Sequence, residues 1–404
     1  MKRSEIDKEK LSPMMVKYLE IKEKYNDTII FYRIGDFYEM FFEDAVIASR
    51  ELELTLTGKN AGLDERVPMC GVPHHAYLPY LEKLVEKGYK VAICEQLTDP
   101  KESKGLVDRG IIEVVTKGTL IDESLKANDF NYIGSIYDFE YCYGFSYADI
   151  STGYVYTSIV EYDEDILINK ILSKNVKELI VNSKFDRNIL STIKDKYHIL
   201  ISIYDDVYDG EEYQYITKKI EDVRLKTGVN HLISYILENK KGDMSHLQEC
   251  NLIDDSNYLL FDSHTRRNLE LTETLREKER MFSLLWLLDK TKTAMGSRLL
   301  KYNIENPLTS IKAINKRYDM VETLLEEFIL KEDLKNLLYE VYDLERLSGR
   351  IAFGNANARD LLQLKSSLKV LPDIKNILNA IKFKDIEPLT DLYELLEKSI
   401  YTYI

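Results

Sequence analysis

The first third of the chain alternates between helical and strand-like spacing of its hydrophobic residues. Apolar positions at helical spacing predict helices over about Met14–Tyr25, Phe37–Leu52 and Tyr77–Lys87. Runs of β-branched and aromatic residues predict strands at Thr28–Arg33, Leu54–Thr57, Val91–Cys94 and Ile111–Thr116, with a loop rich in Gly and Pro at Gly58–Pro73. This order of elements indicates a mixed α/β domain over residues 1–120.

The middle of the chain is dominated by aromatic and β-branched runs separated by turn residues. Three of these runs, Tyr132–Tyr137, Tyr141–Asp149 and Tyr154–Val160, predict an antiparallel meander. Further along, we expect a helix near Ile166–Leu172 and strands at Glu178–Val181 and His198–Ile201. Together they predict a second α/β domain over residues 128–260, which includes a charged linker at 205–226.

Strand patterns nearly vanish after Phe261, where leucines recur at helical spacing. We therefore predict an all-α segment over residues 261–404, with Pro307 and Pro372 marking breaks between helices. The last pattern, Leu389–Tyr403, is helical and has no closing element before Ile404. We expect the chain to be a fragment of a longer protein.

The composition is that of a folded protein with two or three domains. The 404 residues are 45% hydrophobic and 31% charged, with only 8 Pro and 17 Gly, which excludes wholesale disorder. No run of about 18 apolar residues occurs, and the start Met1-Lys2-Arg3 is charged, so we expect a cytoplasmic protein without a membrane span. The four scattered cysteines do not form a disulfide framework, and we expect buried thiols.

The net charge of −14 argues against a protein that coats nucleic acid by bulk attraction, because phosphate contacts need clustered Lys and Arg. Residues 1–120 carry 18 basic and 21 acidic groups, residues 121–260 carry 14 and 25, and residues 261–404 carry 23 of each. We therefore expect any DNA-facing surface in the flanking thirds, and scaffolding or protein partners for the acidic middle.

An aromatic-dense segment follows the first predicted strand. In a helix, Tyr38 and the apolar residues after it share one face and belong to the core, whereas Phe37 lies at the edge of that face. Beside Gly35, where a missing side chain lets another backbone approach, an exposed Phe37 could stack on a nucleobase or wedge between base steps. Glu39 would point elsewhere in a helix, but in an extended segment both side chains could meet one ligand.

Residue types that bind zinc occur near the first domain's Pro- and Gly-rich loop. They are Cys70, His74, His75 and Cys94. Their spacing differs from the closely paired cysteines typical of zinc sites, and turn chemistry already explains the loop. Core thiols are the simpler interpretation.

Other catalytic patterns are weak or missing. Asp149, with Asp138 and Glu140 nearby, could begin a two-metal nuclease site, although solvated turn acids are the simpler interpretation. No Gly-x4-Gly-Lys-Ser/Thr phosphate loop occurs, since Gly296-Ser297-Arg298 lacks both the first glycine and the lysine. No nucleophile elbow or His-Glu-x-x-His run is found either. We expect no enzyme activity and no cofactor in this chain.

Several ordered blocks resemble MutS proteins of DNA mismatch repair. The block Gly35-Asp36-Phe37-Tyr38-Glu39 resembles the mismatch-recognition domain of that family. Later blocks follow the family's order: Val67–Ala76, Val91–Gln96, Val114–Thr119, and then, in the helical core, Thr265–Leu271, Met295–Leu300 and Asp343–Arg346. The resemblance spans the whole chain and is weakest in the acidic middle.

The resemblance implies a role for each part of the chain. Residues 1–120 would be a mismatch-recognition DNA-binding domain, 128–260 a connector with a ribonuclease-H-like fold and no nuclease function, and 261–404 the incomplete core and lever. Phe37 would stack on a mispaired base from the minor groove of double-stranded DNA, and Glu39 would hydrogen-bond that base while discouraging binding to intact duplex. Arg33 is a candidate for a contact with the DNA backbone.

For the parent protein, the resemblance implies partners that this chain does not provide. They are ATP and Mg²⁺ bound by a weak ATPase domain beyond Ile404, a second copy in a homodimer, a MutL-type partner, and a cytoplasmic location at the nucleoid. Two alternatives stay open: a metal-dependent nuclease that uses Asp149, and a non-repair relative that binds branched DNA. Such relatives generally lack the recognition domain, so the Phe37 block counts against the second.

Overall fold

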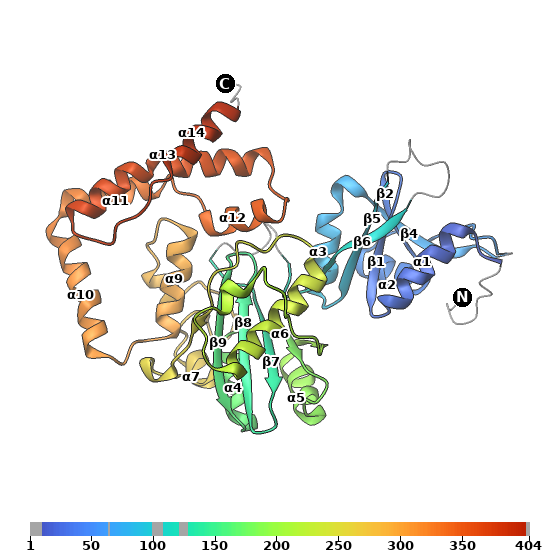
Figure 1. The fold of residues 1–404 in the computed structure, drawn as a ribbon, viewed down its shortest axis with the longest axis horizontal. Coiled ribbons are helices and arrows are strands. Elements are labelled where there is room, and N and C mark those ends of the chain that lie inside the picture. The colour runs from blue at the N-terminus through green and yellow to red at the C-terminus, as the bar shows by residue number, and fades with distance from the viewer. Residues whose placement is uncertain (1–9, 64, 99–107, 121–127, 401–404) are drawn as a thin grey trace. The chain divides into compact units, whose positions relative to one another are not determined.

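The structure is a computed structural model that describes residues 10–63, 65–98, 108–120 and 128–400 (Figure 1). Its strands are β1 (Thr28–Ile34), β2 (Phe37–Phe41), β3 (Thr57–Lys59), β4 (Val67–Pro73), β5 (Lys90–Gln96), β6 (Arg109–Val115), β7 (Tyr132–Asp138), β8 (Cys142–Asp149), β9 (Tyr154–Glu161), β10 (Glu178–Val181), β11 (Leu200–Ile203) and β12 (Asn251–Leu252). They form two six-stranded sheets, with the orders β3-β4-β2-β1-β5-β6 and β11-β10-β7-β8-β9-β12.

The helices surround these sheets and then continue alone to the end of the described chain. They are α1 (Pro13–Lys24), α2 (Phe42–Leu52), α3 (Leu78–Glu86), α4 (Glu164–Ser173), α5 (Arg187–Tyr197), α6 (Val223–Lys240), α7 (Ser263–Asn268), α8 (Leu284–Leu288), α9 (Ala294–Glu305), α10 (Ile311–Glu326), α11 (Phe328–Leu338), α12 (Leu344–Ala352), α13 (Ala358–Ala380) and α14 (Thr390–Ser399). The described residues also include the short 3-10 helices η3 (His74–Ala76), η4 (Gln214–Thr217) and η5 (Asp255–Asn257). Within the described residues, no helix is long and apolar enough to cross a membrane.

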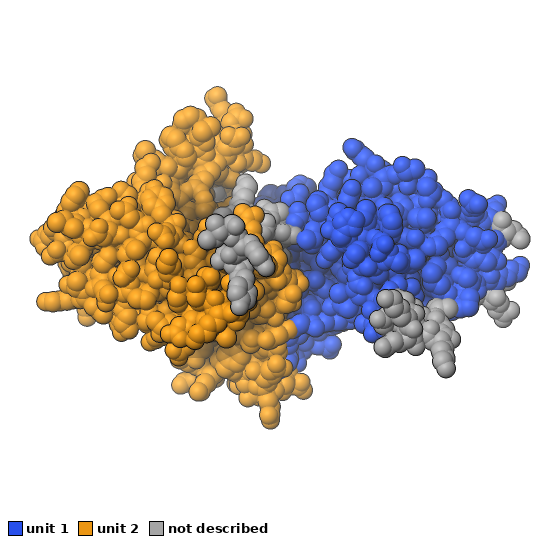
Figure 2. Space-filling model, turned by 90° about the horizontal axis from the view of Figure 1, so that it is seen from above, with its two compact units in different colours: residues 1–124, 177–208, 231–242 blue, residues 125–176, 209–230, 243–404 orange. Residues whose placement is uncertain are grey.

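The described chain divides into two compact units, coloured separately in Figure 2. The first comprises residues 1–124, 177–208 and 231–242, and the second comprises residues 125–176, 209–230 and 243–404. The first unit therefore contains the whole of the first sheet together with β10, β11 and the end of α6.

The first sheet starts with a tight hairpin that the helical prediction missed. β1 and β2 are antiparallel, with Ile34 opposite Phe37, so only Gly35 and Asp36 make the turn. Gly35 has a φ of +55°, which a residue without a Cβ adopts at little cost. The helix predicted from Phe37 is therefore wrong over residues 37–41 and correct over α2. The residues of this run fit both the helical period and the strand period, and the two-residue turn decides in favour of the strand.

Two other sequence predictions in this domain are also corrected. The loop predicted at Gly58–Pro73 contains β4, and the strand predicted at Leu54–Thr57 begins only at Thr57, as β3. Both strands depend on pairing with a neighbour: β4 lies between β3 and β2. A strand with Pro and Gly inside it carries a weak local signal, so tertiary pairing decides its conformation.

Helix α1 is fixed to the first sheet by a buried ion pair. The Nζ atom of Lys22 lies 2.8 Å from Oδ1 of Asp44 in α2, and the two residues are only 3% and 4% exposed. The other carboxylate oxygen of Asp44 accepts hydrogen bonds from the hydroxyl of Tyr18 (3.2 Å) and the backbone N–H of Ile30 (3.1 Å). Because buried charges need partners on all sides, this cluster fixes where α1 and α2 meet β1.

The second domain contains the predicted meander. β7, β8 and β9 are antiparallel neighbours, which confirms the prediction, and β10 pairs with β11 in parallel. The strand predicted at His198–Ile201 lies at Leu200–Ile203, because His198 ends α5 with a φ of +54°. The predicted linker at 205–226 includes η4 and the start of α6.

A buried carboxylate joins four segments of the first unit. Glu178 of β10 is fully buried and accepts hydrogen bonds from the hydroxyls of Thr116, Ser202 (2.8 Å) and Tyr235 (2.6 Å) and from the Gly118 N–H (3.2 Å). The donors come from the segment after β6, from β11 and from α6. A carboxylate buried with this many donors ties these segments together.

The part after Phe261 is all-helical in its described residues, as predicted. Six helices begin with a side chain that accepts a backbone N–H of the first turn: Asp262, Ser283, Thr293, Ser310, Asp343 and Asn357.

The predicted break between helices at Pro307 is confirmed, but the predicted break at Pro372 is wrong, because α13 continues through it. Buried Leu368, Val370 and Ile374 hold this stretch against its neighbours although proline removes one helical hydrogen bond. The predicted helix end at Tyr401–Tyr403 lies outside the described residues.

The second unit contains a very close backbone contact. A Cβ built on Gly349 of α12 would lie 2.6 Å from the carbonyl oxygen of Ser151, in the turn after β8. Real Cβ atoms do not approach backbone so closely, so only glycine fits at this position.

We predict that Gly35→Ala reduces the free energy of unfolding by about 1 kcal/mol, because an L-residue at positive φ is strained. A Cβ at this position has no neighbour within 4 Å, so steric overlap adds nothing. Urea denaturation of the chain measures the change, and Gly35→Asn, which tolerates positive φ better, should lose less. An alanine variant as stable as the parent would contradict the turn geometry.

We also predict that acid destabilises the fold through His231. Burial lowers the pKa of this imidazole, whose Nε2–H donates to the Tyr204 carbonyl oxygen at 2.7 Å. Below about pH 6.5 the unfolded chain binds a proton that the folded chain does not, so the free energy of unfolding falls by up to about 1.4 kcal/mol per pH unit until the folded pKa is reached. Buried His246 contributes in the same direction.

The measurement is urea denaturation between about pH 7.5 and 5.5. His231→Gln should flatten part of the pH dependence, because it removes the buried imidazole. An unchanged slope in His231→Gln would contradict this assignment.

Candidate functional site

The strand conformation of β2 places Phe37 and Glu39 on the same face of the first sheet. Successive side chains of a strand alternate between faces, so Tyr38 and Met40 lie on the other face, where both are buried. Phe37 is 47% exposed, which is unusual for a large aromatic side chain at the end of a core strand. Of the two conformations considered from the sequence, the structure has the extended one, in which both side chains face the same way.

Helix α1 covers only part of that face. Tyr32, directly opposite Glu39 in β1, and Phe41, two residues along β2, are fully buried with residues of α1. On the other side of β2, Pro73 of β4 lies opposite Phe37, and Gly71 lies opposite Glu39. The end of β2 nearest the Gly35 turn therefore presents Phe37 beyond the part of the face that α1 covers.

Among the described residues, Glu39 is paired with one cation, Lys59. The Nζ atom of Lys59, at the end of β3, lies 2.5 Å from Oε2 of Glu39, and the two side chains are 26% and 16% exposed. The same ammonium lies 5.5 Å from the ring centroid of Phe41, a cation–π distance. The carboxylate of Glu39 is thus neutralised and oriented by a side chain from β3.

Arg33 stabilises the turn that carries Phe37. Its Nε donates to the carbonyl oxygen of Gly35 at 2.5 Å, and its Nη1 lies 3.4 Å from Oε1 of Glu95 in β5. The hydroxyl of Tyr38 donates to the same Glu95 oxygen, and burial together with this carboxylate raises the pKa of that phenol. With a side chain 16% exposed, Arg33 has a structural role here, and its contact with the DNA backbone stays a prediction.

The cysteines of this domain lie on opposite faces of the sheet. Cys70 pairs with Met40, on the face away from Glu39, whereas Cys94 pairs with Tyr32, on the face of Glu39. Burial raises the pKa of both thiols to about 12, and because the sheet lies between them, the two thiols cannot bind one zinc ion together. The zinc hypothesis is therefore wrong for this pair, and the expectation of buried thiols is confirmed.

The carboxylates proposed for a nuclease do not converge. Asp149 pairs with Tyr132 and Asp138 pairs with Tyr143, so the two acids lie at opposite ends of the β7–β8 hairpin, about 20 Å apart at strand spacing. Asp149 is fully buried and accepts hydrogen bonds from the N–H groups of Asn131 and Ser151, each at 2.9 Å. Burial raises its pKa. Among the described residues, no three His, Cys, Asp or Glu side chains gather as a metal site.

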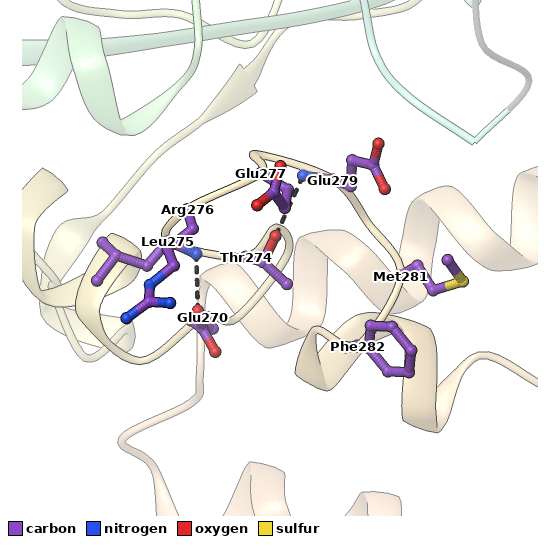
Figure 3. Close-up of a pocket in the computed structure, with 8 residues that line it drawn as sticks. All are labelled: Glu270, Thr274, Leu275, Arg276, Glu277, Glu279, Met281 and Phe282. Carbon is purple, nitrogen blue, oxygen red and sulfur yellow. Dashed lines mark hydrogen bonds between the residues drawn. The ribbon is translucent and has the colours of Figure 1, made fainter.

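A small pocket in the helical section contains several charged residues but no reactive arrangement. The loop between α7 and α8 encloses a volume of about 300 Å³ (Figure 3). Its polar groups make hydrogen bonds within the loop. Oε1 of Glu270 accepts a hydrogen bond from the N–H of Leu275 at 2.7 Å, and Oγ1 of Thr274 accepts one from the N–H of Glu279 at 3.3 Å. The exposed Phe282 at its rim has a φ of +71°. We assign no chemistry to this pocket.

Sequence reasoning missed Lys59, Glu95 and Arg109 as neighbours of the site. Arg109 donates from Nε to the carbonyl oxygen of Arg33 at 2.9 Å and lies over the Tyr32 ring. Glu95 belongs to one of the blocks that suggested the resemblance, but nothing local indicates that it contacts Arg33 and Tyr38. These contacts depend on strand order, which spacing along one chain does not reveal.

Comparison with protein families finds three matching domain models, in order along the chain. MutS domain I matches residues 12–124, MutS domain II matches residues 131–248, and MutS domain III matches residues 264–403. The Phe37–Glu39 strand lies within the first match.

Similar curated proteins are named DNA mismatch repair protein MutS. The protein of Listeria innocua is 44% identical over 400 residues, covering 96% of this chain and 46% of its own length. The proteins of Geobacillus sp. (42% over 398 residues, 96% of this chain) and Clostridium tetani (44% over 409 residues, 97% of this chain) are also covered over 46% of their length. The chain thus spans slightly less than half of these relatives. With all three domain models matched in order, the chain belongs to the MutS family of DNA mismatch repair proteins.

Proposed function

We propose that this chain recognises mispaired or looped bases in double-stranded DNA, with Phe37 as the inserting side chain and Glu39 as the hydrogen-bonding partner of the base. The observation that carries the proposal is the strand alternation of β2, which gives both side chains the same direction at an exposed end of the sheet. The proposal includes the division into a recognition domain (1–120), a ribonuclease-H-like connector (128–260) and a helical core and lever (261–404).

Selectivity would come from the cost of deforming the duplex. Inserting an aromatic ring between base steps unstacks and kinks DNA, and this costs several kcal/mol when all pairs are intact. A mismatch already lacks part of its pairing energy, so the same insertion costs less there. A ring that is 47% exposed and anchored on a rigid hairpin is suited to this task, since little of the ring must leave the core.

Glu39 would contribute discrimination more than affinity. A carboxylate near phosphates is repelled unless it gains a hydrogen bond in return, and a mispaired base offers donors that a paired base does not. The exposed turn at Gly35 and Asp36 is the nearest backbone to Phe37, and no side chain crowds Gly35. We therefore expect DNA to approach the hairpin at this turn.

The remaining activities belong, in this proposal, to the whole protein of which the relatives are examples. They are binding of ATP and Mg²⁺, homodimer formation, interaction with a MutL-type partner and a location at the nucleoid. The segment Gly296-Ser297-Arg298 does not form a phosphate loop: it lies inside α9, and Arg298 is paired with Asp343 at 2.6 Å and Glu345 at 2.6 Å. No step of the proposed recognition uses ATP.

We predict that Phe37→Ala abolishes the preference for mismatched over matched duplex. Base–aromatic stacking contributes about 1–3 kcal/mol, so the affinity for a mismatched duplex should fall by roughly 5- to 150-fold, with little change for a matched duplex. Fluorescence anisotropy with matched and mismatched oligonucleotides at one salt concentration measures both affinities.

The control is Leu56→Ala, which removes another exposed apolar side chain (46% exposed) of the same domain. It should leave both affinities unchanged. A Phe37→Ala variant that keeps the mismatch preference of the parent would disprove the proposed role.

A further inference from the structure

We propose that Lys59 is a positioning residue that holds Glu39 ready for a mispaired base and thereby sets the discrimination between mismatched and matched DNA. The inference rests on the proposed function and adds to it a residue from a different strand. Its basis is the ion pair between β3 and β2 together with the arrangement of the strand that lies between them.

The ion pair spans a whole strand. In the order β3-β4-β2, the partners are separated by β4, and the β4 residue opposite Glu39 is Gly71. A Cβ at Gly71 would lie 3.5 Å from Cγ of Glu39 and 3.1 Å from the Tyr38 carbonyl oxygen, in contact with the carboxylate stem. With hydrogen at position 71, no β4 side chain stands directly beside Glu39, and Lys59 reaches it.

The ammonium is held by more than the carboxylate. It lies 2.5 Å from Oε2 of Glu39 and 5.5 Å from the ring centroid of Phe41, whose side chain is fully buried. A cation placed between a carboxylate and a fixed aromatic ring has fewer accessible positions than one on an open surface. Lys59 therefore orients the carboxylate as well as balancing its charge.

The two oxygens of Glu39 are left with different tasks. Oε2 is engaged by Lys59, whereas no hydrogen bond within the described residues involves Oε1. A carboxylate accepts hydrogen bonds on both oxygens, so Oε1 can accept one from a base while Oε2 stays with the ammonium. The orientation that Lys59 imposes is thus compatible with base recognition and is present before DNA binds.

Charge balance matters most when DNA covers the site. Contact with a duplex removes water from Glu39 and brings phosphates near it, and both effects raise the energy of an uncompensated carboxylate. Without Lys59 the carboxylate would also lose its fixed orientation. We therefore expect Lys59→Met to lower the ratio of mismatched to matched affinity by roughly three- to tenfold, the range for a partly exposed charged hydrogen bond.

The test is a double-mutant cycle in which the ratio of mismatched to matched affinity is measured for each variant. Lys59→Met, Glu39→Gln and the double variant are compared with the parent by anisotropy on matched and mismatched duplexes. If Lys59 acts through Glu39, Lys59→Met lowers the ratio in the parent and leaves it unchanged in the Glu39→Gln background. Lys59→Arg, which preserves the cation, should restore most of the ratio.

The matched control is Arg66→Met, which removes a cation beside the same edge strand at an exposed residue. It should leave the ratio unchanged. Thermal unfolding of each variant verifies that it is folded. If Lys59→Met does not fold, Lys59→Arg still tests whether a cation at position 59 preserves the affinity ratio.

Two outcomes would overturn the inference. If Lys59→Met lowers both affinities equally in both backgrounds and reduces the salt dependence by about one ion, Lys59 is a phosphate contact. If the ratio does not change at all, the ion pair is structural only. Phe37→Ala is measured alongside: should it abolish the preference while Lys59→Met does not, only the role of Lys59 fails, whereas a parent without any preference refutes the proposed function as well.

Discussion

The alternation of side chains along one short strand governs what this protein can present to a ligand. β2 has five residues, and its two-residue turn with β1 fixes which of them face α1 and which face the other helices. A shift of one residue would send Phe37 into the core and bring Tyr38 to the surface, since strand side chains alternate strictly. The buried contacts of Tyr38 with Glu95 and of Phe41 with α1 oppose such a shift from both faces. The direction of Phe37 and Glu39 is therefore set by contacts that other residues make.

The position of α1 decides how much of that face is available. The buried pair of Lys22 and Asp44 connects α1, α2 and the backbone of β1, and a change of one partner would leave a charge uncompensated in the core. Beyond the part of the face that α1 covers, Glu39 is paired with Lys59 of β3, and Glu95 of β5 contacts Arg33 and Tyr38 on either side of the turn. Ionic and hydrogen-bonding groups thus surround the candidate site, although its central residue, Phe37, is apolar.

Much of the fold follows from local patterns. The predictions fail where tertiary contacts decide the conformation. The β7–β9 meander and the helices after Phe261 carry strong periodicity and were predicted correctly, whereas the run from Phe37 to Phe41 satisfies helix and strand patterns equally well. Phe37 and Glu39 are candidates through the resemblance to a family. The residues alone indicate only that an exposed Phe37 could stack on a nucleobase or wedge between base steps. Lys59 and Glu95 could not be found, because their contacts require knowledge that β4 and β1 lie between or beside them in the sheet. Pro372 misled the prediction because packing around α13 outweighs one lost hydrogen bond.

The contact between Gly349 and Ser151 has a mechanical consequence for the second unit. Position 349 has no room even for a Cβ, so the backbone of α12 lies directly against the β8–β9 turn. Movement of α12 towards this turn is therefore blocked at Gly349. A larger residue at position 349 would push α12 away from the turn and change the angle between two otherwise intact parts.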